Sequence, residues 1–371
     1  MKVKNSIVFV ALFVMVLSAA AKGASWNDRV KLSGDFRQRH ELIQDESKDE
    51  DRTRWRIRAR LVLSAVISDE LSVGMRLASG SDDPVSTNQS LDGGFSTKGF
   101  GLDLVYFDYH PEAVKGLSIV GGKMKLPFLK VQKTELLWDG DLNPEGLAAT
   151  FNGKLNDKVS VILGSAFFYI EENSSSDDYY MVGAQGALKV KPAEGMHLMA
   201  GVGYYDYNID PEETYCYFDN EDSFGNTAVV DPGDADKLMY ATDFNEFEFL
   251  GEFGYRKDKL AFYLYGNYVM NTAADSLDTG YLVGATLKRG KGKGNVKLAV
   301  NYREIEDDAV IGVFTDSDFR GGGTDGNGLE LGFGYGLADK IDMGLSYFLN
   351  NKGIDEEVDY KRLQVDLKVK F

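Results

Sequence analysis

The chain carries a row of arginines whose spacing indicates a shared chemical role. In the segment RTRWRIRARL, arginine occupies every second position: Arg52, Arg54, Arg56, Arg58 and Arg60. Guanidinium groups bind carboxylates and phosphates through paired hydrogen bonds, so such a row would suit a binding track for anionic solutes. A simpler interpretation is that the arginines pair with acidic side chains on neighbouring strands.

The period of this segment indicates a β-strand. Trp55, Ile57, Ala59 and Leu61 fill the alternate positions, so a strand would place the arginines on one face and the apolar side chains on the other. A helix would scatter both kinds around its axis and leave no apolar stripe to bury. The segment is therefore predicted to be a strand with one wet face and one apolar face.

A second group of charged residues lies in the stretch GKMKLPFLKVQKTELLWDGDLNPEG, residues 122–146. An apolar run, Leu136-Leu137-Trp138, stands among the carboxylates of Glu135, Asp139, Asp141 and Glu145. If these acids faced the arginines, the two groups would create an electric field that discriminates among solutes by charge and dipole. The alternative is an ordinary outward loop.

The sequence offers little for catalysis, metal binding or cofactor binding. Its histidines, His40, His110 and His197, show no metal-ligand spacing, and no serine stands in a G-x-S-x-G setting. A phosphate-binding glycine loop is absent as well. We therefore expect no enzyme, no cofactor and no dedicated metal site.

The chain is strongly acidic, with a formal net charge of −17, which argues against a nucleic-acid partner. Acidic segments such as QDESKDED and DPEETYCYFDNEDS invite a calcium hypothesis, but they lack the ligand spacing of an EF-hand loop. They are expected to be solvated surface, with bridging by divalent cations to lipopolysaccharide as an additional role. The single cysteine, Cys216, allows no internal disulfide.

The N-terminus has the pattern of a secretory signal peptide. Lys2 and Lys4 precede an apolar run over residues 7–17, and Ser18-Ala19-Ala20-Ala21 supplies the small residues of a cleavage site. We predict a signal peptide over residues 1–21 and a mature chain over residues 22–371. No later stretch reaches the roughly 20 apolar residues of a membrane helix. Export is therefore expected.

The mature chain reads as an unbroken series of strands. Its connections alternate between short turns, such as residues 68–70 and 338–340, and long polar loops, such as residues 80–99 and 210–237. This alternation is typical of a single transmembrane antiparallel β-barrel of about 16 strands, with short periplasmic turns and long extracellular loops. The expected strand starts are Val30, Arg54, Leu71, Phe100, Leu117, Gly146, Val159, Tyr179, Met196, Phe244, Leu260, Thr279, Val296, Leu329, Ile341 and Tyr360.

A membrane barrel also fixes the direction of the arginine row. An arginine that faces lipid at the bilayer midplane costs about 2–4 kcal/mol, so several together would exceed the roughly 5–15 kcal/mol stability of an ordinary fold. The row is therefore predicted to face a water-filled lumen. On the preceding strand, Arg37 and Arg39 share the parity of Lys31 and Ser33 and are expected in the same wall.

The chain ends in LQVDLKVKF, in which one face carries Leu363, Val365, Leu367, Val369 and Phe371. A terminal strand that ends in phenylalanine resembles the signature of bacterial outer-membrane barrels, where it serves as an assembly signal. This resemblance implies an outer-membrane location and recognition of Phe371 by the barrel assembly machinery.

Together these motifs resemble the bacterial outer-membrane "putative porin" family. Specific motifs cover residues 52–61, residues 122–146 and the C-terminus, while the strand pattern extends over most of the mature chain. The resemblance implies a sixteen-stranded, trimeric pore for passive diffusion of ions and small hydrophilic solutes, and it names no particular solute. Besides the arginine row, the matching positions are Gly122-Lys123, Pro127, Trp138-Asp139, Asp141 and Pro144-Glu145-Gly146.

The resemblance also suggests a role for residues 127–145. In sixteen-stranded porins the third long loop folds inward and narrows the pore, and this segment is the third long connection here. We therefore predict a constriction in which arginines face carboxylates. The residues predicted to line it are Arg37, Arg39, Arg52, Arg54, Arg56, Arg58, Arg60, Glu135, Asp139, Asp141 and Glu145.

Three functions remain open on the sequence. The first is a general or mildly selective porin. The second is a substrate-specific channel for oxyanions or nutrients, in which the arginines form a binding track. The third is a non-conducting barrel whose long loops act as an adhesin or structural anchor.

Overall fold

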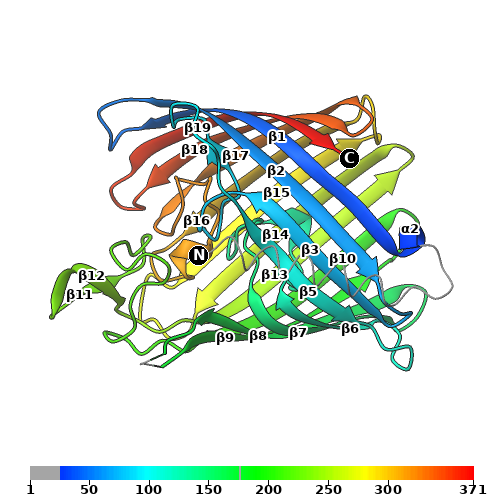
Figure 1. Cartoon of the computed structure of the whole chain (residues 1–371), viewed down its shortest axis with the longest axis horizontal. Coiled ribbons are helices and arrows are strands. Elements are labelled where there is room, and N and C mark those ends of the chain that lie inside the picture. Colours follow the sequence, from blue (N-terminus) through cyan, green and yellow to red (C-terminus); the bar gives the residue numbers. More distant parts are fainter. Residues whose placement is uncertain (1–25, 175–176) are drawn as a thin grey trace.

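The computed structural model describes residues 26–174 and 177–371 (Figure 1). The signal peptide predicted over residues 1–21 lies outside them. In the described part, 16 antiparallel strands close into one barrel, which confirms the predicted fold class. One short helix, α2 (Trp26–Arg29), precedes the first strand. No helix among the described residues is long and apolar enough to span a membrane.

The barrel strands begin close to the predicted positions, with the largest shift at β17, which starts at Gly326 rather than Leu329. Two-residue β4 (Gln89–Ser90), the hairpin of β11 (Ala228–Asp231) and β12 (Asp234–Tyr240), and the 3-10 turns η1 (Val131–Lys133) and η2 (Gly312–Phe314) lie in the loops. The barrel strands are β1 (Val30–Asp45), β2 (Arg52–Val66), β3 (Leu71–Ser79), β5 (Phe100–Tyr109), β6 (Leu117–Lys123), β7 (Glu145–Lys154), β8 (Val159–Glu171), β9 (Tyr179–Val190), β10 (Met196–Tyr207), β13 (Asn245–Lys257), β14 (Leu260–Asn271), β15 (Thr279–Arg289), β16 (Val296–Ile305), β17 (Gly326–Ala338), β18 (Ile341–Lys352) and β19 (Val358–Lys370).

The seam of the barrel joins its first and last strands. β1 pairs with β2 on one side and with β19 on the other, and Asp35 stands opposite Lys370. The backbone N–H of Phe371 donates to the carbonyl of Gly34 at 3.1 Å, and the N–H of Gly34 donates back at 3.2 Å. The terminal aromatic residue is thus hydrogen-bonded into the closing strand pair.

Side chains alternate between the outer surface and the lumen, as the period of the strands predicts. On β17, Leu329, Leu331 and Tyr335 are each more than a third exposed on the outer surface. The intervening Gly332 and Gly334 face inward, opposite Ala299 and Lys297 of β16. Such a wall presents apolar side chains to lipid and small or polar ones to water.

The two ends of the barrel differ in their connections. Short turns join β13 to β14 and β17 to β18, where Asp258 and Lys340 adopt positive φ. The opposite end carries the long loops, among them residues 80–99, 124–144, 208–244 and 306–325. In Figure 1 the β11–β12 hairpin projects beyond that end, while α2 and the C-terminus lie at the other. The short-turn end is the periplasmic one.

The barrel contains an apolar core formed largely by its loops. Trp138 of loop 124–144 is 3% exposed and packs on Phe128 and on Tyr205 of β10. In loop 306–325, Val310 and Ile311 are likewise buried. Both loops therefore turn inward and bury apolar side chains inside the strand wall, which shapes the remaining water-filled space.

A glycine pair marks the place where loop 124–144 leaves the wall. Gly122 and Gly146 stand directly opposite each other on β6 and β7 and have φ values of 117° and 154°. A Cβ at Gly146 would lie 2.1 Å from the carbonyl oxygen of Phe167, and one at Gly122 would lie 2.3 Å from that of Val105. Glycine is required here because any side chain would clash and disfavour the backbone conformation.

Candidate functional site

The first part of the site is a group of arginines on three adjoining strands, β1, β2 and β19, which we name the arginine wall. The register of β1 with β2 sets Arg37 opposite Arg58 and Arg39 opposite Arg56. Like charges directly opposite each other in a strand pair are destabilising, so this arrangement needs compensating acids. The arginine wall comprises Arg37, Arg39, Arg54, Arg56, Arg58, Arg60 and Arg362.

Most of these arginines are held by carboxylates. Arg39 donates to both oxygens of Asp366, with Nε–Oδ1 at 2.7 Å and Nη2–Oδ2 at 3.0 Å, and it contacts Asp318 at 3.0 Å. Arg362 donates to Glu41 at 2.7 Å and pairs with Asp318 at the same distance. Arg39, Arg362, Glu41 and Asp366 are almost completely buried, and the acids are shared between cations, so each charge in the network has more than one close partner. The acids that pair with the wall are Asp35, Glu41, Asp141, Asp318 and Asp366.

Four members of the wall retain unused hydrogen-bond capacity. The Nε atoms of Arg37, Arg56, Arg58 and Arg362 are buried without a partner. Arg37 also donates to Asn88, and Arg56 donates to Ser86 at 3.2 Å; both acceptors belong to the inward part of loop 80–99. Because the arginines outnumber the acids that pair with them, the wall carries an excess of positive charge.

Loop 124–144 crosses the lumen to the opposite wall. Gln185 of β9 accepts from the backbone N–H of Leu129 at 2.7 Å and donates to its carbonyl at 3.0 Å. Farther along, Gln132 of η1 donates to Glu252 of β13 at 2.6 Å and accepts from Lys288 of β15 at 2.9 Å. The loop is therefore tied to strands far from its own ends.

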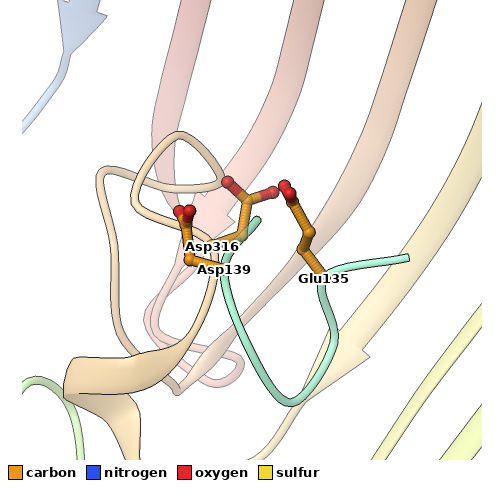
Figure 2. Close-up of side chains that lie close together, drawn as sticks. All are labelled: Glu135, Asp139 and Asp316. Carbon is orange, nitrogen blue, oxygen red and sulfur yellow. The ribbon is translucent and has the colours of Figure 1, made fainter. Parts of the chain in front are cut away.

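The second part of the site is an acidic cluster of Glu135, Asp139 and Asp316 (Figure 2). The first two residues come from loop 124–144 and the third from loop 306–325, and their carboxylate oxygens lie within 4.8 Å of one another. Asp139 accepts from the backbone N–H groups of Asp141 at 2.7 Å and Ser317 at 3.0 Å. These bonds fix the two loops against each other.

The acidic cluster has the spacing of a cation site, but most of its carboxylate oxygens already accept hydrogen bonds or form an ion pair. Both oxygens of Asp139 accept backbone hydrogen bonds, and Asp316 pairs with Arg303 at 2.9 Å. Within the cluster, the Glu135 carboxylate differs in that it accepts no hydrogen bond from any described residue. A hard cation would need several free oxygens, so we assign no metal to this cluster.

The pKa values of Glu135 and Asp139 in the acidic cluster are shifted in the opposite direction from that of Asp141, the acid beside the arginines. Burial raises the pKa of Asp139 to about 8, and the nearby Asp316 carboxylate adds to the rise. Burial also raises the pKa of Glu135 well above its usual range, reinforced by Asp316 and Asp139. For Asp141, burial pushes upward, but Arg58 and Arg60 outweigh it and hold the pKa below its usual value. Near pH 7, Asp139 is thus largely neutral and Asp141 ionised.

The predicted site residues separate into three groups in the structure. Asp141 contacts Arg60 at 3.4 Å and Arg58 at 3.6 Å, so it belongs with the arginine wall. Arg52 lies exposed at the extracellular end of β2 and makes no ion pair with any described residue. Glu145 differs from the prediction: it shares the outward parity of Leu147, is exposed and pairs with Lys123 at 2.7 Å. The reason is that Glu145 is the first residue of β7 rather than part of the inward loop, so it follows the outward alternation of that strand.

A cavity of about 650 Å³ lies between the arginine wall and the acidic cluster. Arg37, Arg58 and Arg60 line one part of it, and Glu135 and Asp139 line another. It is large enough for small solutes. The arrangement places fixed charges of both signs around one water-accessible passage.

Loop 306–325 contributes residues that the sequence analysis did not predict for the site. Asp316 and Asp318 contact Arg303, Arg39 and Arg362. The segment AVIGVF, residues 309–314, was a usable signal, because an apolar run within a polar extracellular loop indicates that the loop packs inward. The partners of these acids could not be inferred, since they lie on strands remote in sequence.

The comparisons with known proteins agree with this architecture. The family model described as "putative porin" matches residues 43–237 and 234–371. The chain belongs to this porin family. Its location is therefore the bacterial outer membrane, as predicted, and membership supports an outer-membrane channel. No relative was found among curated proteins.

Solved outer-membrane proteins share the fold of this porin at low sequence identity. OprB of Pseudomonas putida aligns with a TM-score of 0.61 at 12% identity, covering 93% of this chain and 95% of that one. OmpF of Salmonella typhi gives 0.55 at 10%, covering 92% and 97%. OmpT of Vibrio cholerae, as the loop L8 deletion mutant, gives 0.53 at 12%, covering 92% and 99%. At such identities the likeness establishes the barrel fold alone.

Proposed function

We propose that this porin forms a water-filled channel for passive diffusion of ions and small hydrophilic solutes, and that it prefers anions at neutral pH. Residues 127–145 act as the constriction, and the arginine wall dominates the field across it. The proposal includes the predicted signal peptide over residues 1–21, which would direct export.

The observation that carries this proposal is the unequal charge on the two sides of the central cavity. The arginines of the wall outnumber the acids that pair with them, and Arg37, Arg58 and Arg60 line the cavity. Opposite them, the raised pKa values of Glu135 and Asp139 reduce the negative charge near pH 7. Anions are therefore favoured in the narrow region because the field there is predominantly positive.

Reversal potentials in planar bilayers would test the proposal. Refolded porin in a gradient of potassium chloride is expected to show anion preference, and the double variant Arg56→Ala/Arg58→Ala is expected to move the reversal potential toward zero. Arg52→Ala, at the exposed end of the same strand, is the matched control and should change it less. Absence of conductance would favour an anchor or adhesin, and cation preference would refute the assigned filter.

A trimeric assembly is a further part of the proposal. β6 has 7 residues, fewer than the about 9–11 that a membrane-spanning strand needs. The ion pair between Lys123 and Glu145 lies on this outer face, where lipid would be unfavourable. OmpT of Vibrio cholerae, one of the similar structures, has a trimer form. A neighbouring subunit that covers β5–β7 would shield both the short strand and the outward ion pair from lipid.

Substitutions on this face would test the assembly. Leu102→Arg and Leu147→Arg alter side chains that are 51% and 53% exposed there, and we expect both to convert trimers to monomers in detergent. Leu264→Arg, at 48% exposure on β14, is the control and should leave assembly unchanged. Trimers that survive both face variants would exclude this interface.

The remaining partners are proposed on the same basis. Phe371 would be read by the barrel assembly machinery, and the acidic extracellular loops would bind lipopolysaccharide through divalent cations. Deleting Phe371 should reduce the amount of folded barrel in the outer membrane, whereas unchanged assembly would remove that role. Chelation that leaves lipopolysaccharide binding intact would remove the cation bridge.

A further inference from the structure

We propose that Lys133, Lys288 and Lys297 form a binding site for small oxyanions on the periplasmic side of loop 124–144. We call these three residues the lysine cluster. The inference rests on the proposed channel function and adds a site that the arginine wall does not include. Inorganic phosphate represents the ligand class: a compact, highly charged oxyanion that leaves the constriction toward the periplasm.

The topology places the lysine cluster at the periplasmic end. Lys288 is the penultimate residue of β15, and Lys297 is the second residue of β16, on either side of the short turn over residues 290–295. Lys288 shares the inward face with Thr286, while Leu287 and Leu298 point outward. Lys133 reaches the same region on η1, because its neighbour Gln132 accepts a hydrogen bond from Lys288 at 2.9 Å.

No acid within residues 26–174 and 177–371 forms an ion pair with these three lysines, and two nearby carboxylates, Glu252 and Glu330, have other partners. Glu252 is bound by His197 at 2.6 Å and by Gln132 at 2.6 Å. Glu330 is bound by Asn301 and Arg303. Lys133 and Lys297 are exposed within the lumen, so their ammonium groups are accessible to a solute.

The register makes this arrangement unfavourable for the protein alone. Lys288 and Lys297 stand directly opposite each other in the β15–β16 pair, and like charges in that position destabilise a sheet. Like charges also stand opposite each other in the arginine wall, but there five carboxylates pair with them. The lysine cluster has no carboxylate in ion-pair contact within the described residues. An anion bound between the strands would supply the missing negative charge.

The chemistry of the surrounding groups suits an oxyanion. Lysine ammonium groups act as mobile point charges for phosphate and carboxylate oxygens. Lys288 lies 4.8 Å from the ring centre of Tyr263, which restrains it by a cation–π contact. The ammonium groups of Lys133 and Lys297 form no hydrogen bond or ion pair with a described residue, whereas Lys288 donates to the Gln132 amide.

The lysine cluster continues the basic surface of the central cavity. Lys125 and Lys133 line the same cavity as Arg60 and Arg76. Burial lowers the pKa of Lys125, and the positive charges of Arg76, Arg60 and Lys133 lower it further, which is consistent with their proximity. An anion that passes the arginine wall would thus meet the lysine cluster next, on its way to the periplasm.

Phosphate block of chloride current would test the site. Single-channel chloride current through the wild-type porin should be interrupted by inorganic phosphate added on the periplasmic side. In Lys288→Gln/Lys297→Gln, the apparent dissociation constant for block should rise on the order of tenfold, equivalent to about 1.4 kcal/mol. Lys293→Gln, in the adjoining periplasmic turn, is the charge-matched control and should behave as wild type.

The outcomes separate this inference from the channel proposal. Wild-type channels that conduct chloride but are not blocked by phosphate would overturn the lysine cluster and leave the channel intact. Equal block in the double variant would also overturn it, by assigning the block to another site. Absence of wild-type current would refute both proposals. Lysine-to-glutamine changes relieve repulsion, so loss of folding is not expected, and a heat-dependent gel shift checks that the barrel forms.

Discussion

The arginine wall and the lysine cluster are both basic and both face the lumen, yet they differ in how their charge is balanced. Arg39 and Arg362 are nearly buried and share Glu41, Asp318 and Asp366 with their neighbours. The lysines at positions 133, 288 and 297 have no carboxylate partner within the described ranges 26–174 and 177–371. One region therefore contributes to the fold through its pairs, and the other is available to solutes.

This difference teaches that a count of basic residues does not identify an anion site. Arginines in a dense ion-pair network are held in place by acids that also cancel much of their charge. Lysines without carboxylate partners are fewer than the arginines of the wall, but their charge is left for an anionic solute to balance. The solute-facing capacity of the arginine wall is confined to the members that line the central cavity, Arg37, Arg39, Arg58 and Arg60.

Breaking a pair in the arginine wall should have the largest effect. Arg39→Ala would remove the bidentate partner of Asp366 and one of the two arginines on Asp318, leaving Lys368 at 3.1 Å and Arg362 at 2.7 Å, and we expect a loss of about 1.5–3 kcal/mol in the free energy of unfolding. Urea unfolding of the refolded barrel in lipid, followed by tryptophan fluorescence, measures it. A loss below 1 kcal/mol would mean that water compensates these acids.

An intermediate effect is expected from the titration of the acidic cluster. The pKa of Asp139 is raised to about 8, so its carboxyl is neutral below that pH and negative above it. Anion preference should therefore weaken as the pH rises through about 8. Reversal potentials between pH 6 and pH 9.5 measure the step.

Two matched variants test whether the pH-dependent change in anion preference comes from the Asp139 carboxyl. Asp139→Asn should abolish it, because the titrating group is gone. Asp141→Asn should change the preference similarly at every pH in the range, because the arginines keep the pKa of Asp141 low and its charge is already present. A step that persists in Asp139→Asn would assign the titration to another member of the coupled cluster.

The smallest effect is expected from the lysine cluster in the absence of ligand. Lys297→Gln removes one charge of the directly opposed pair, and we expect the free energy of unfolding to rise by about 0.2–1 kcal/mol. The midpoint of the heat-dependent gel shift, measured in phosphate-free buffer, checks this. A fall in stability would show that Lys297 makes a favourable contact and would weaken the contrast with the arginine wall.

Much of the barrel could be predicted because membrane strands obey a local rule. Side chains alternate between lipid and water with a period of two, so strands such as β1, β15 and β18 begin where the pattern begins. The same rule set the parity of Arg37, Arg39 and the row from Arg54 to Arg60. Glu145 was predicted from its place in the loop rather than from this rule, and the structure puts it in β7, where it alternates outward with Leu147.

The sequence by itself determined the strand number, the facing of the arginines and the grouping of carboxylates in the second half of loop 124–144, since these depend on neighbours along the chain. Only the tertiary structure decided which charges meet. Arg39 and Asp366 are brought together by barrel closure, and Asp139 and Asp316 by the packing of two loops. The register of the β15–β16 hairpin sets Lys288 opposite Lys297, and the fold brings no acid into ion-pair contact with them within residues 26–174 and 177–371. Charge balance at close range is a property of spatial neighbours, and a linear pattern of residues does not specify them.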